Sequence, residues 1–270
     1  MISDSSELPI AAPAGAASGA HLIGCAGWSL HKEVAAEFPA EGSHLERYAA
    51  VFPAVEINSS FYRPHQPATY ARWAASVPPD FRFSVKLPKA ISHEARLRDA
   101  DGLLDRFAFE VNHLGAKLGC VLVQLPPKGV FDEEAARDFL PRLRARVGCM
   151  LALEGRHPTW FSDAATDVLR EHGVTRVIAD PAAGQPGPHV PTTEAGYIRL
   201  HGTPKVYYSS YPPEFLHKVE RRIAAMTARG ADCWCIFDNT AAFAAVPNAL
   251  EVMRTLDSPW SAPLSASTAN

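Results

Sequence analysis

The chain has 270 residues, of which 47% are hydrophobic and 20% are charged, a composition typical of a globular protein. A formal net charge of −3 and a sequence pI near 6.4 argue against tight binding of duplex nucleic acid, although they leave single-stranded nucleic acid open. No apolar run approaches the roughly 20 residues that span a bilayer, so no membrane partner is expected.

The two ends of the chain differ in composition from its middle. Residues 1–20 are small, acidic and proline-containing, which predicts a disordered tail and not a signal peptide, and residues 259–270 predict a flexible tail. No linker-like stretch interrupts residues 21–258, which are therefore expected to form a single domain. The five cysteines form no CxxC pair, which together with the missing secretory signal predicts a cytoplasmic protein.

Eight short apolar runs, each ending in polar residues, recur along the chain. In order, they lie in HLIGCAGW, PAVEINSS, FRFSVKLP, CVLVQLPP, CMLALEGRHP, TRVIAD, GYIRLHG and CWCIFDNT. They stand roughly 20 to 40 residues apart, the length of a strand plus a crossover helix. Each run is therefore predicted to be a strand of a parallel sheet.

Helical patterns occupy most of the intervals between these runs. They cover residues 44–52, 67–77, 102–119, 132–147, 162–173 and 212–230. Asp132 and Ser162 are candidate N-caps, Gly119, Gly173 and Gly230 are candidate stop signals, and Pro141 is expected to kink or break its helix. Residues 181–195 are rich in proline and glycine and predict a loop. Eight alternating units favour a (β/α)8 barrel of the TIM type that lacks the helix between strands six and seven; a doubly wound open sheet is the alternative.

Polar residues gather at the carboxyl ends of the predicted strands, where ligands collect in such barrels. Side chains of a strand repeat every two residues, so Glu56 and Asn58, Glu154 and Arg156, and Arg199 and His201 should point into the barrel mouth. Their neighbours Val55, Ile57, Leu153, Ile198 and Leu200 should pack on the helices. Lys86, Gln124, His157, Asp180, Asp238 and Asn239 also end strands. Any one of these residues can be structural, but their gathering at eight strand ends predicts a functional site.

Seven motifs also resemble a known family. GCAGWS, VEINSSFYR, FRFSVKLP, LGCVLVQLPP, EGRHPTWF, YIRLHG and FDNTAAFAAVPNA are similar, in this order, to motifs of the domain-of-unknown-function-72 family (YecE-like), over residues 21–256. The resemblance implies a TIM-barrel-like fold and no particular reaction. It implies family polar positions at Glu56, Asn58, Lys86, Gln124, Glu154, Arg156, His157, Arg199, His201, Asn239 and Thr240. Asp238 and Gly155 depart from the pattern, which leads us to expect Asn and Phe there.

The predicted site combines cations with carboxylates. Lys86, Arg156 and Arg199 suit recognition of a carboxylate or phosphate, Glu154 is a candidate general base, and His201 is a candidate acid. Glu56 is expected to hold a cation such as Lys86 or to contact the substrate, while Asn58, Gln124, His157 and Asn239 would bind it. Tyr62, like Trp28 and Trp160, could stack on a substrate ring or simply anchor its loop. These residues predict a hydrolase or lyase acting on a small anionic or phosphorylated molecule.

Two other functions remain open. Glu56, Glu154, Asp180, His201 and Asp238 could bind a divalent metal, as a metal-dependent hydrolase or isomerase requires, although the interleaved arginines disfavour it. No motif predicts an organic cofactor. A non-catalytic nucleotide or nucleic-acid binder would use a basic rim with tyrosine stacking groups. These rim residues would be Arg63, Lys86, Arg96, Arg98, Arg156 and Lys205, with Tyr207, Tyr208 and Tyr211.

Overall fold

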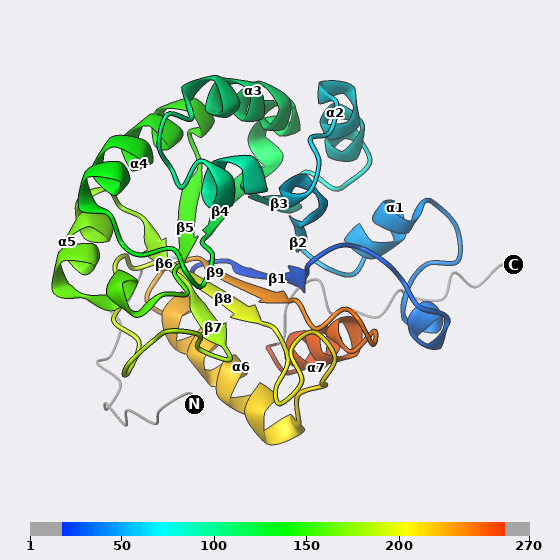
Figure 1. Cartoon of the computed structure of the whole chain (residues 1–270). Helices are drawn as coiled ribbons and strands as arrows, with labels where there is room; N and C mark the ends of the chain where they lie inside the picture. The colour runs from blue at the N-terminus through cyan, green and yellow to red at the C-terminus, as the bar shows by residue number, and fades with distance from the viewer. Residues whose placement is uncertain (1–17, 257–270) are drawn as a thin grey trace, which may run out of the picture.

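Parallel strands follow one another round a barrel-like core in the computed structural model, which describes residues 18–256 (Figure 1). The strands are β1 (His21–Cys25), β2 (Ala54–Ile57), β3 (Arg82–Lys86), β4 (Leu118–Gln124), β5 (Met150–Glu154), β6 (Thr175–Arg176), β7 (Ile178–Asp180), β8 (Gly196–Leu200) and β9 (Cys233–Phe237). All eight predicted runs are strands, and the sixth run is split into β6 and β7 at Val177.

The strands form two sheets, one in the order β2-β3-β4-β5-β6 and the other in the order β7-β8-β9-β1. This order follows the chain continuously, unlike a doubly wound sheet, whose strand order reverses at a switch point. The fold is therefore α/β and TIM-barrel-like, as the alternating pattern predicts.

The two sheets meet at two places. Between β1 and β2 there is a single parallel bridge, from Ala26 to Glu56. The Tyr48 hydroxyl reinforces it by accepting a hydrogen bond from the Cys25 N–H (2.8 Å) and donating one to the Ala54 carbonyl (3.0 Å). At the other junction the chain itself passes from β6 to β7 through Val177, whose N–H bonds the carbonyl of Leu153 (2.9 Å). We call the β1–β2 contact the Tyr48 junction.

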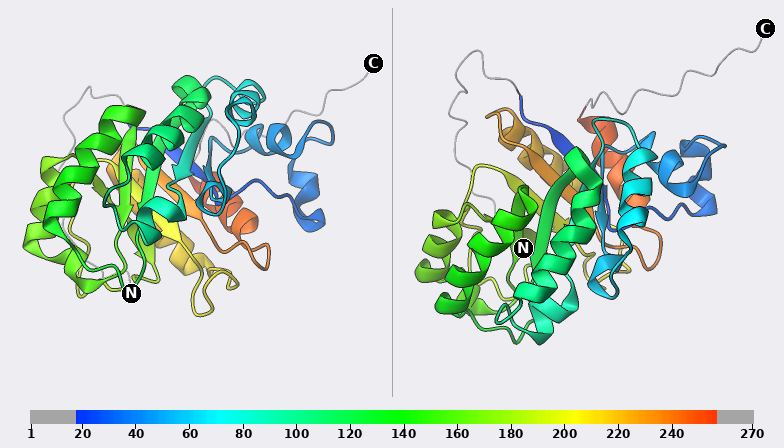
Figure 2. Two further views of the ribbon diagram at one scale, coloured as in Figure 1. Left: turned by 45° about the horizontal axis from the view of Figure 1, so that its top comes forward. Right: turned by 90° about the horizontal axis from the view of Figure 1, so that it is seen from above.

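Helices surround the strands, with α3 to α5 along one side and α6 and α7 along the other (Figure 2). Their bounds are α1 (His44–Ala49), α2 (Pro67–Ala75), α3 (Asp101–Val111), α4 (Glu133–Val147), α5 (Asp163–Glu171), α6 (Pro213–Thr227) and α7 (Ala245–Thr255). Short 3-10 helices cover Lys32–Glu37, Ser59–Phe61, Asn112–Lys117 and Pro158–Phe161, and a π-helix covers Ala90–Glu94. Residues 181–195, all of which are described, form no helix, as predicted.

The helix ends follow local chemistry. Asp132 and Ser162 accept hydrogen bonds from the backbone N–H groups of Ala135 and Ala165, which confirms both predicted N-caps. Of the kink or break predicted at Pro141, the break was wrong, because Pro141 lies inside α4 without ending it. Gly119 lies within β4, so it is no stop signal, and the chain before that strand turns at Gly115 instead (φ 58°).

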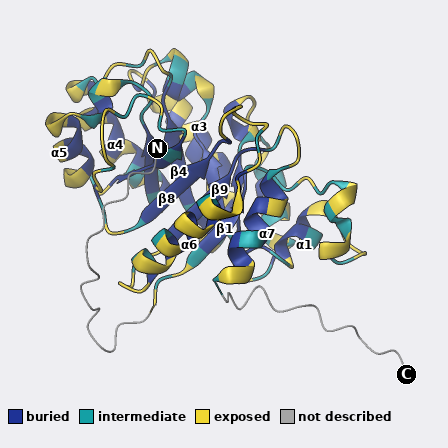
Figure 3. Ribbon diagram, turned by 90° about the horizontal axis from the view of Figure 1, so that it is seen from below, coloured by how far each residue is buried: buried dark blue, intermediate teal, exposed yellow. Residues whose placement is uncertain are grey.

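Apolar side chains fill two layers. The outer layer lies between strands and helices and contains Val55, Ile57, Leu153, Ile198 and Leu200, as predicted. The inner layer fills the barrel itself with Leu22, Ala54, Cys120, Leu122, Ala152, Val177, Tyr197, Trp234 and Ile236. Figure 3 shows the strands mostly buried, while the helices expose their outer faces. The inner layer stops short of the carboxyl ends of the strands, which leaves that end to polar side chains.

The chain ends extend past the described region. Residues 1–17 and 257–270, which contain most of the two predicted tails, lie outside the described residues. Residues 18–20 belong to the fold, because the N–H groups of Gly19 and Ala20 bond the Thr227 carbonyl (2.9 Å) and the Asp232 carboxylate (2.8 Å). None of the helices in residues 18–256 combines the length and apolar character that crossing a bilayer requires.

Candidate active site

Arg199 of β8 lies at the centre of the barrel mouth with no exposed surface. Its guanidinium makes five hydrogen bonds, one for each N–H, so it has no donor left for a ligand in this arrangement. Two bonds go to Glu56 (2.7 and 3.0 Å), one to Glu154 (2.7 Å), one to Asp238 (3.1 Å) and a longer one to Gln124 (3.4 Å). Together with His201, these residues form what we call the Arg199 cluster.

Glu56 supports this cluster and does not face the solvent. Its side chain is fully buried, and besides Arg199 it accepts a hydrogen bond from the Tyr197 hydroxyl (2.9 Å). That hydroxyl lies 2.7 Å from the Ser84 hydroxyl on β3. Of the two roles predicted for Glu56, the structure gives it the role of holding a cation, and the cation is Arg199 instead of Lys86. Tyr197 and Ser84 escaped prediction, although each lies two residues before a predicted site residue on the same strand face.

His201 is held between two carboxylates of the cluster. Its Nδ1 lies 2.9 Å from Asp238 Oδ2, and its Nε2 lies 3.2 Å from Glu154 Oε1. Burial alone would lower the pKa of His201, but Glu154 and Asp238 outweigh it and raise this pKa above its usual value. Burial would raise the pKa of Glu154, yet Arg199, His201 and Arg156 hold it well below its usual range. A carboxylate of so low a pKa is a weak base, so Glu154 is better suited to holding charge than to taking a proton.

Lys86 at the end of β3 lies beside the cluster without being bonded into it. Only 6% of its surface is exposed, and its Nζ lies 4.2 Å from the centre of the Phe61 ring. Lys86 Nζ makes no hydrogen bond or ion pair with any of the described residues. Burial and the nearby Arg199 cation lower the pKa of Lys86 to about 8, against the attraction of the cluster's carboxylates. Lys86 is thus a buried amine that exchanges its proton near neutral pH.

Arg156 offers free donors at the mouth. Its Nε donates to Glu154 (2.8 Å), and its side chain keeps 17% of its surface exposed. Neither terminal amino group has a hydrogen-bond partner within residues 18–256. At the end of β2, the side-chain oxygen of Asn58 is buried and likewise lacks a partner in the described part of the chain. Unpaired polar groups of this kind are costly unless a ligand or water satisfies them.

His93 and Phe61 complete this side of the mouth and escaped prediction. The His93 ring lies 4.9 Å from the Phe61 ring, the same ring that Lys86 contacts, and its Nδ1 lies 2.9 Å from the Ser92 hydroxyl. Burial, Lys86 and Arg156 all lower the pKa of His93. His93 belongs to the π-helix Ala90–Glu94, a rare element often found at functional sites. Strand periodicity could not find it, because it lies beyond the end of β3.

Three predicted binding residues make contacts within the fold. Tyr62 is 78% exposed and packs edge-on against Phe61, on the outside of the loop. His157 caps the 3-10 helix Pro158–Phe161 and bonds the Thr159 hydroxyl (2.9 Å). Asn239 is fully buried and donates to the Ser209 carbonyl (3.0 Å) and to Asn248 (2.9 Å), which fastens the loop after β8 to α7. Its side-chain oxygen has no partner in the described region.

The loop after β8 covers part of the mouth. The Tyr207 ring lies 6.0 Å from the His201 ring, and the Tyr207 N–H bonds the His201 carbonyl (2.6 Å). Tyr208 is exposed, whereas Tyr211 is buried and its hydroxyl bonds Asp180 and the Gly202 N–H. The three tyrosines therefore do not form one stacking surface, contrary to what a nucleic-acid rim would require.

The proposed metal ligands do not form an ion-binding group. Within residues 18–256, no three side chains of His, Cys, Asp or Glu are arranged to hold a metal ion. The oxygens of Glu56, Glu154 and Asp238 converge on the Arg199 guanidinium, so a cation already occupies the position between them. Asp180 is separate from this group and accepts a hydrogen bond from the Thr203 hydroxyl (2.7 Å). These residues do not fit a divalent metal centre.

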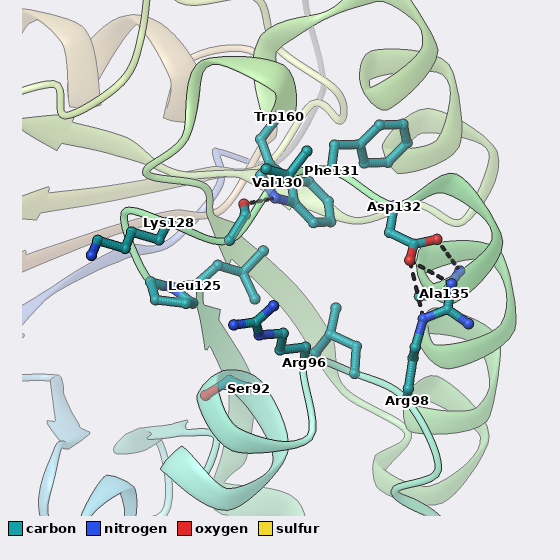
Figure 4. A pocket seen from close by; sticks show the side chains of 13 residues that line it. Ser92, Arg96, Arg98, Leu125, Lys128, Val130, Phe131, Asp132, Ala135 and Trp160 are labelled. Atoms are coloured by element: carbon teal, nitrogen blue, oxygen red, sulfur yellow. Dashed lines mark hydrogen bonds and ion pairs between the residues drawn. The ribbon is translucent and has the colours of Figure 1, made fainter.

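A cavity of ≈ 440 Å³ opens beside the mouth, between the loops that follow β3, β4 and β5 (Figure 4). Its walls are mainly apolar, and Ser92, the neighbour of His93, lies at its edge. Arg96 reaches between Leu125 and Ser92. The backbone here is strained, because Arg96, Leu97 and Asp99 all have positive φ (51°, 67° and 47°). Such strain persists where surrounding contacts enforce it and is common at ligand sites.

Charge at the mouth is unbalanced towards positive. Glu56, Glu154 and Asp238 are three acidic groups, whereas Arg156, Arg199, His201 and Lys86 are four basic ones. Arg199 and His201 use all their donors within the cluster, on carboxylates and on the Gln124 amide oxygen, so the surplus falls on Lys86 and the free end of Arg156. A small anion placed there would balance the group.

Similar proteins were found in both sequence and structure. The sequence profile described as "Protein of unknown function DUF72" matches residues 22–269. The "UPF0759 protein YecE" of Escherichia coli (strain K12) is 34% identical over 142 residues, which cover 50% of this chain and 52% of that protein. The chain thus matches about half the length of that relative.

Among solved structures, a DUF72 family protein from Thermotoga maritima MSB8 superposes with a TM-score of 0.74 at 25% identity, covering 88% of this chain and all of that one. A sugar phosphate isomerase/epimerase from Parabacteroides distasonis ATCC 8503 gives 0.52 at 10% identity, covering 92% and 98%, which is a likeness of fold alone. The profile match spans nearly the whole described barrel, including every residue of the Arg199 cluster, and the chain therefore belongs to the DUF72 family of proteins of unknown function.

Proposed function

We propose that the protein is an enzyme that binds a small anionic substrate at the barrel mouth and carries out lyase-type chemistry by proton transfer. The observation that carries the proposal is the pairing of two basic side chains with unused donors, Lys86 and Arg156, beside carboxylates that Arg199 already neutralises. An arginine fork with two free amino groups suits a carboxylate or phosphate.

The roles differ from those that the sequence alone suggests. Glu154 and His201 hold charge and orientation, because each is bonded to opposite charges on both sides. Lys86 takes the role of the proton-exchanging group, since burial and Arg199 bring its pKa to about 8. A general base works best when its pKa lies near the working pH.

Anion binding to the full chain tests the proposal. We expect inorganic phosphate or small dicarboxylates such as oxalate to raise the melting temperature, because a ligand of the native state stabilises it by mass action. Arg156→Gln should abolish this shift. Arg72→Gln, which removes an exposed arginine of α2, should leave it unchanged. Binding that is as tight in Arg156→Gln as in the wild type, or no shift with any of these anions, would refute the proposed site.

A further inference from the structure

We propose that Lys86 is a nucleophile that forms a Schiff base with the carbonyl carbon of its substrate, and that the substrate is therefore an oxo acid whose carboxylate binds Arg156. This inference rests on the proposed function and names the substrate class of the same site. It accounts for a lysine that is buried at the mouth yet bonded to nothing in the described structure.

The surroundings of Lys86 make its ammonium easier to deprotonate than that of a free lysine. The side chain lies against the Phe61 ring, which offers no hydrogen-bond acceptor of ordinary strength, and the Arg199 guanidinium adds a second positive charge nearby. Desolvation and a neighbouring cation are the two means by which proteins activate lysine as a nucleophile. A lysine meant only to pair with carboxylates would be expected to bond Glu56, Glu154 or Asp238, and it bonds none of them within residues 18–256.

A proton carrier lies on the same aromatic ring. His93 contacts Phe61 from the π-helix, and its Nδ1 is placed by the Ser92 hydroxyl. Since burial, Lys86 and Arg156 all lower the pKa of His93, its imidazole is a proton acceptor at neutral pH. His93 can therefore take a proton from the lysine and return it to the leaving oxygen.

The reaction balances without any further reactant. The ammonium of Lys86 gives one proton to His93, and the free amine attacks the carbonyl carbon, whose π electrons move to oxygen. His93 returns its proton to that oxygen, and a second proton passes from the nitrogen to the oxygen as water leaves and the C=N bond forms. In total, Lys–NH₃⁺ and a carbonyl give Lys–NH⁺=C and one water molecule. The protonated imine then draws electrons from the neighbouring C–C or C–H bond, which is the chemistry of a lyase.

Reductive trapping of the full chain tests this inference directly. The protein is incubated at pH 7 with glyoxylate, pyruvate or 2-oxoglutarate in the presence of cyanoborohydride, and the modified lysines are located by peptide mass spectrometry. Lys89, whose side chain is 53% exposed, serves as an internal control in the same protein. We expect at least one of the three acids to label Lys86 about tenfold or more faster than Lys89, because a pKa near 8 leaves far more free amine than the ordinary value of about 10.4. Labelling of Lys86 no faster than Lys89 by all three would overturn the inference.

Two variants separate this inference from the proposed function. Lys86→Arg keeps the positive charge and should keep the phosphate or oxalate shift while losing the adduct. Arg156→Gln should slow trapping at Lys86 and leave Lys89 labelling unchanged. Anion binding without an adduct at Lys86 would leave the proposed function standing and refute the Schiff base. An adduct that Arg156→Gln does not slow would refute the role of Arg156 in binding the carboxylate.

Discussion

Arg199 carries a charge in the barrel interior that only its carboxylate neighbours make tolerable. Moving a guanidinium out of water costs several kcal/mol, and the three carboxylates that face it would each be equally costly alone. The cluster is therefore interdependent, since the loss of one member leaves the others as buried, unpaired charges. Arg156, which is partly exposed, does not share this dependence.

Replacing Arg199 should consequently cost stability, whereas replacing Arg156 should mainly cost binding. We expect Arg199→Gln to lower the free energy of unfolding by about 3–5 kcal/mol, the usual effect of removing one partner from a buried pair. Arg156→Gln should lower it by less than about 1 kcal/mol. Urea denaturation of both variants measures the difference. Equal losses of unfolding free energy in the two variants would mean that the buried Arg199 cluster does not contribute more to stability than Arg156 does.

The pKa of His201 predicts how stability depends on pH. The folded state binds this proton more tightly than the unfolded chain does, because the pKa is raised on folding. The resulting stabilisation is complete below about pH 6.5 and is lost as the pH rises through the folded-state pKa. The difference in unfolding free energy between the wild type and Asp238→Asn, which weakens the hold on His201, should therefore shrink as the pH rises above 6.5. A difference that grows in this range would contradict the assignment.

Lys86 should act on stability in the opposite direction. Its pKa is lowered on folding, so the unfolded chain binds this proton more tightly, and its contribution to stability rises between about pH 8 and pH 10.5. At pH 7 the buried charge is a cost, and Lys86→Met should raise the free energy of unfolding by roughly 3–3.5 kcal/mol, at about 1.4 kcal/mol per pKa unit for a pKa lowered from 10.5 to about 8. The gain should shrink as the pH rises above about 8 and vanish only above about pH 10.5. Lys89→Met, at an exposed position, should change little.

At the scale of the elements, Gly155 makes room for the short helix that follows β5. A Cβ at this position would lie 2.6 Å from the Cβ of Trp160, whose indole N–H donates to the Gly129 carbonyl (3.0 Å) beside the cavity of Figure 4. The resemblance of the motifs led us to expect Phe at residue 155. Here a buried Trp160 packs against that position instead.

Gly155→Ala should therefore displace Trp160. We expect a loss of roughly 1–3 kcal/mol in the free energy of unfolding, the usual cost of overpacking. Trp160 should also become more exposed, which tryptophan fluorescence quenching can follow in a variant that retains Trp160 as its single tryptophan. Gly187→Ala, at a position with open space around the missing Cβ, is the matched control. Unchanged fluorescence and stability would show that the segment after β5 accommodates the added Cβ without a loss in the free energy of unfolding.

Sequence periodicity predicts the strands and their inward-facing side chains well. It predicts poorly which residues those side chains contact. Alternation predicted that Glu56, Glu154 and Arg199 point inward, because a strand repeats every two residues whatever its surroundings. Alternation could not predict that Arg199 would form ion pairs with all three carboxylates of the cluster, because those contacts depend on strands that only the whole fold brings together. His93 was missed for a related reason. The π-helix that carries it has no signature in local hydrophobic spacing.

At the scale of the whole molecule, the two sheets are joined more weakly than the strands within each sheet. The Tyr48 junction replaces a ladder of backbone bonds by one bridge and one hydroxyl. Gly24 permits this close approach, because a Cβ there would lie 1.9 Å from the Ala54 carbonyl oxygen. The Arg199 cluster spans the same division, with Arg199, His201 and Asp238 from one sheet and Glu56, Gln124 and Glu154 from the other.

Tyr48→Phe should open this junction. The substitution keeps the ring but leaves the Cys25 N–H and the Ala54 carbonyl buried without a partner, at about 1–3 kcal/mol for each unsatisfied group. Amide exchange should speed up most at Cys25 in β1, since its N–H loses its acceptor. Tyr70→Phe, another buried tyrosine whose hydroxyl has no hydrogen bond in the described structure, is the control. Uniform acceleration across all strands would instead indicate global destabilisation.

The division of the Arg199 cluster between the sheets also bears on the order in which the chain is made. Glu56 and Glu154 leave the ribosome before Arg199, and Asp238 follows last. A nascent chain that has only reached β7 holds two carboxylates and the Lys86 amine where the barrel interior will be, without the guanidinium that later binds them. Burying these groups at that stage would cost more than it gains. We therefore expect the barrel interior to exclude water only after β8, which carries Arg199, has been synthesised.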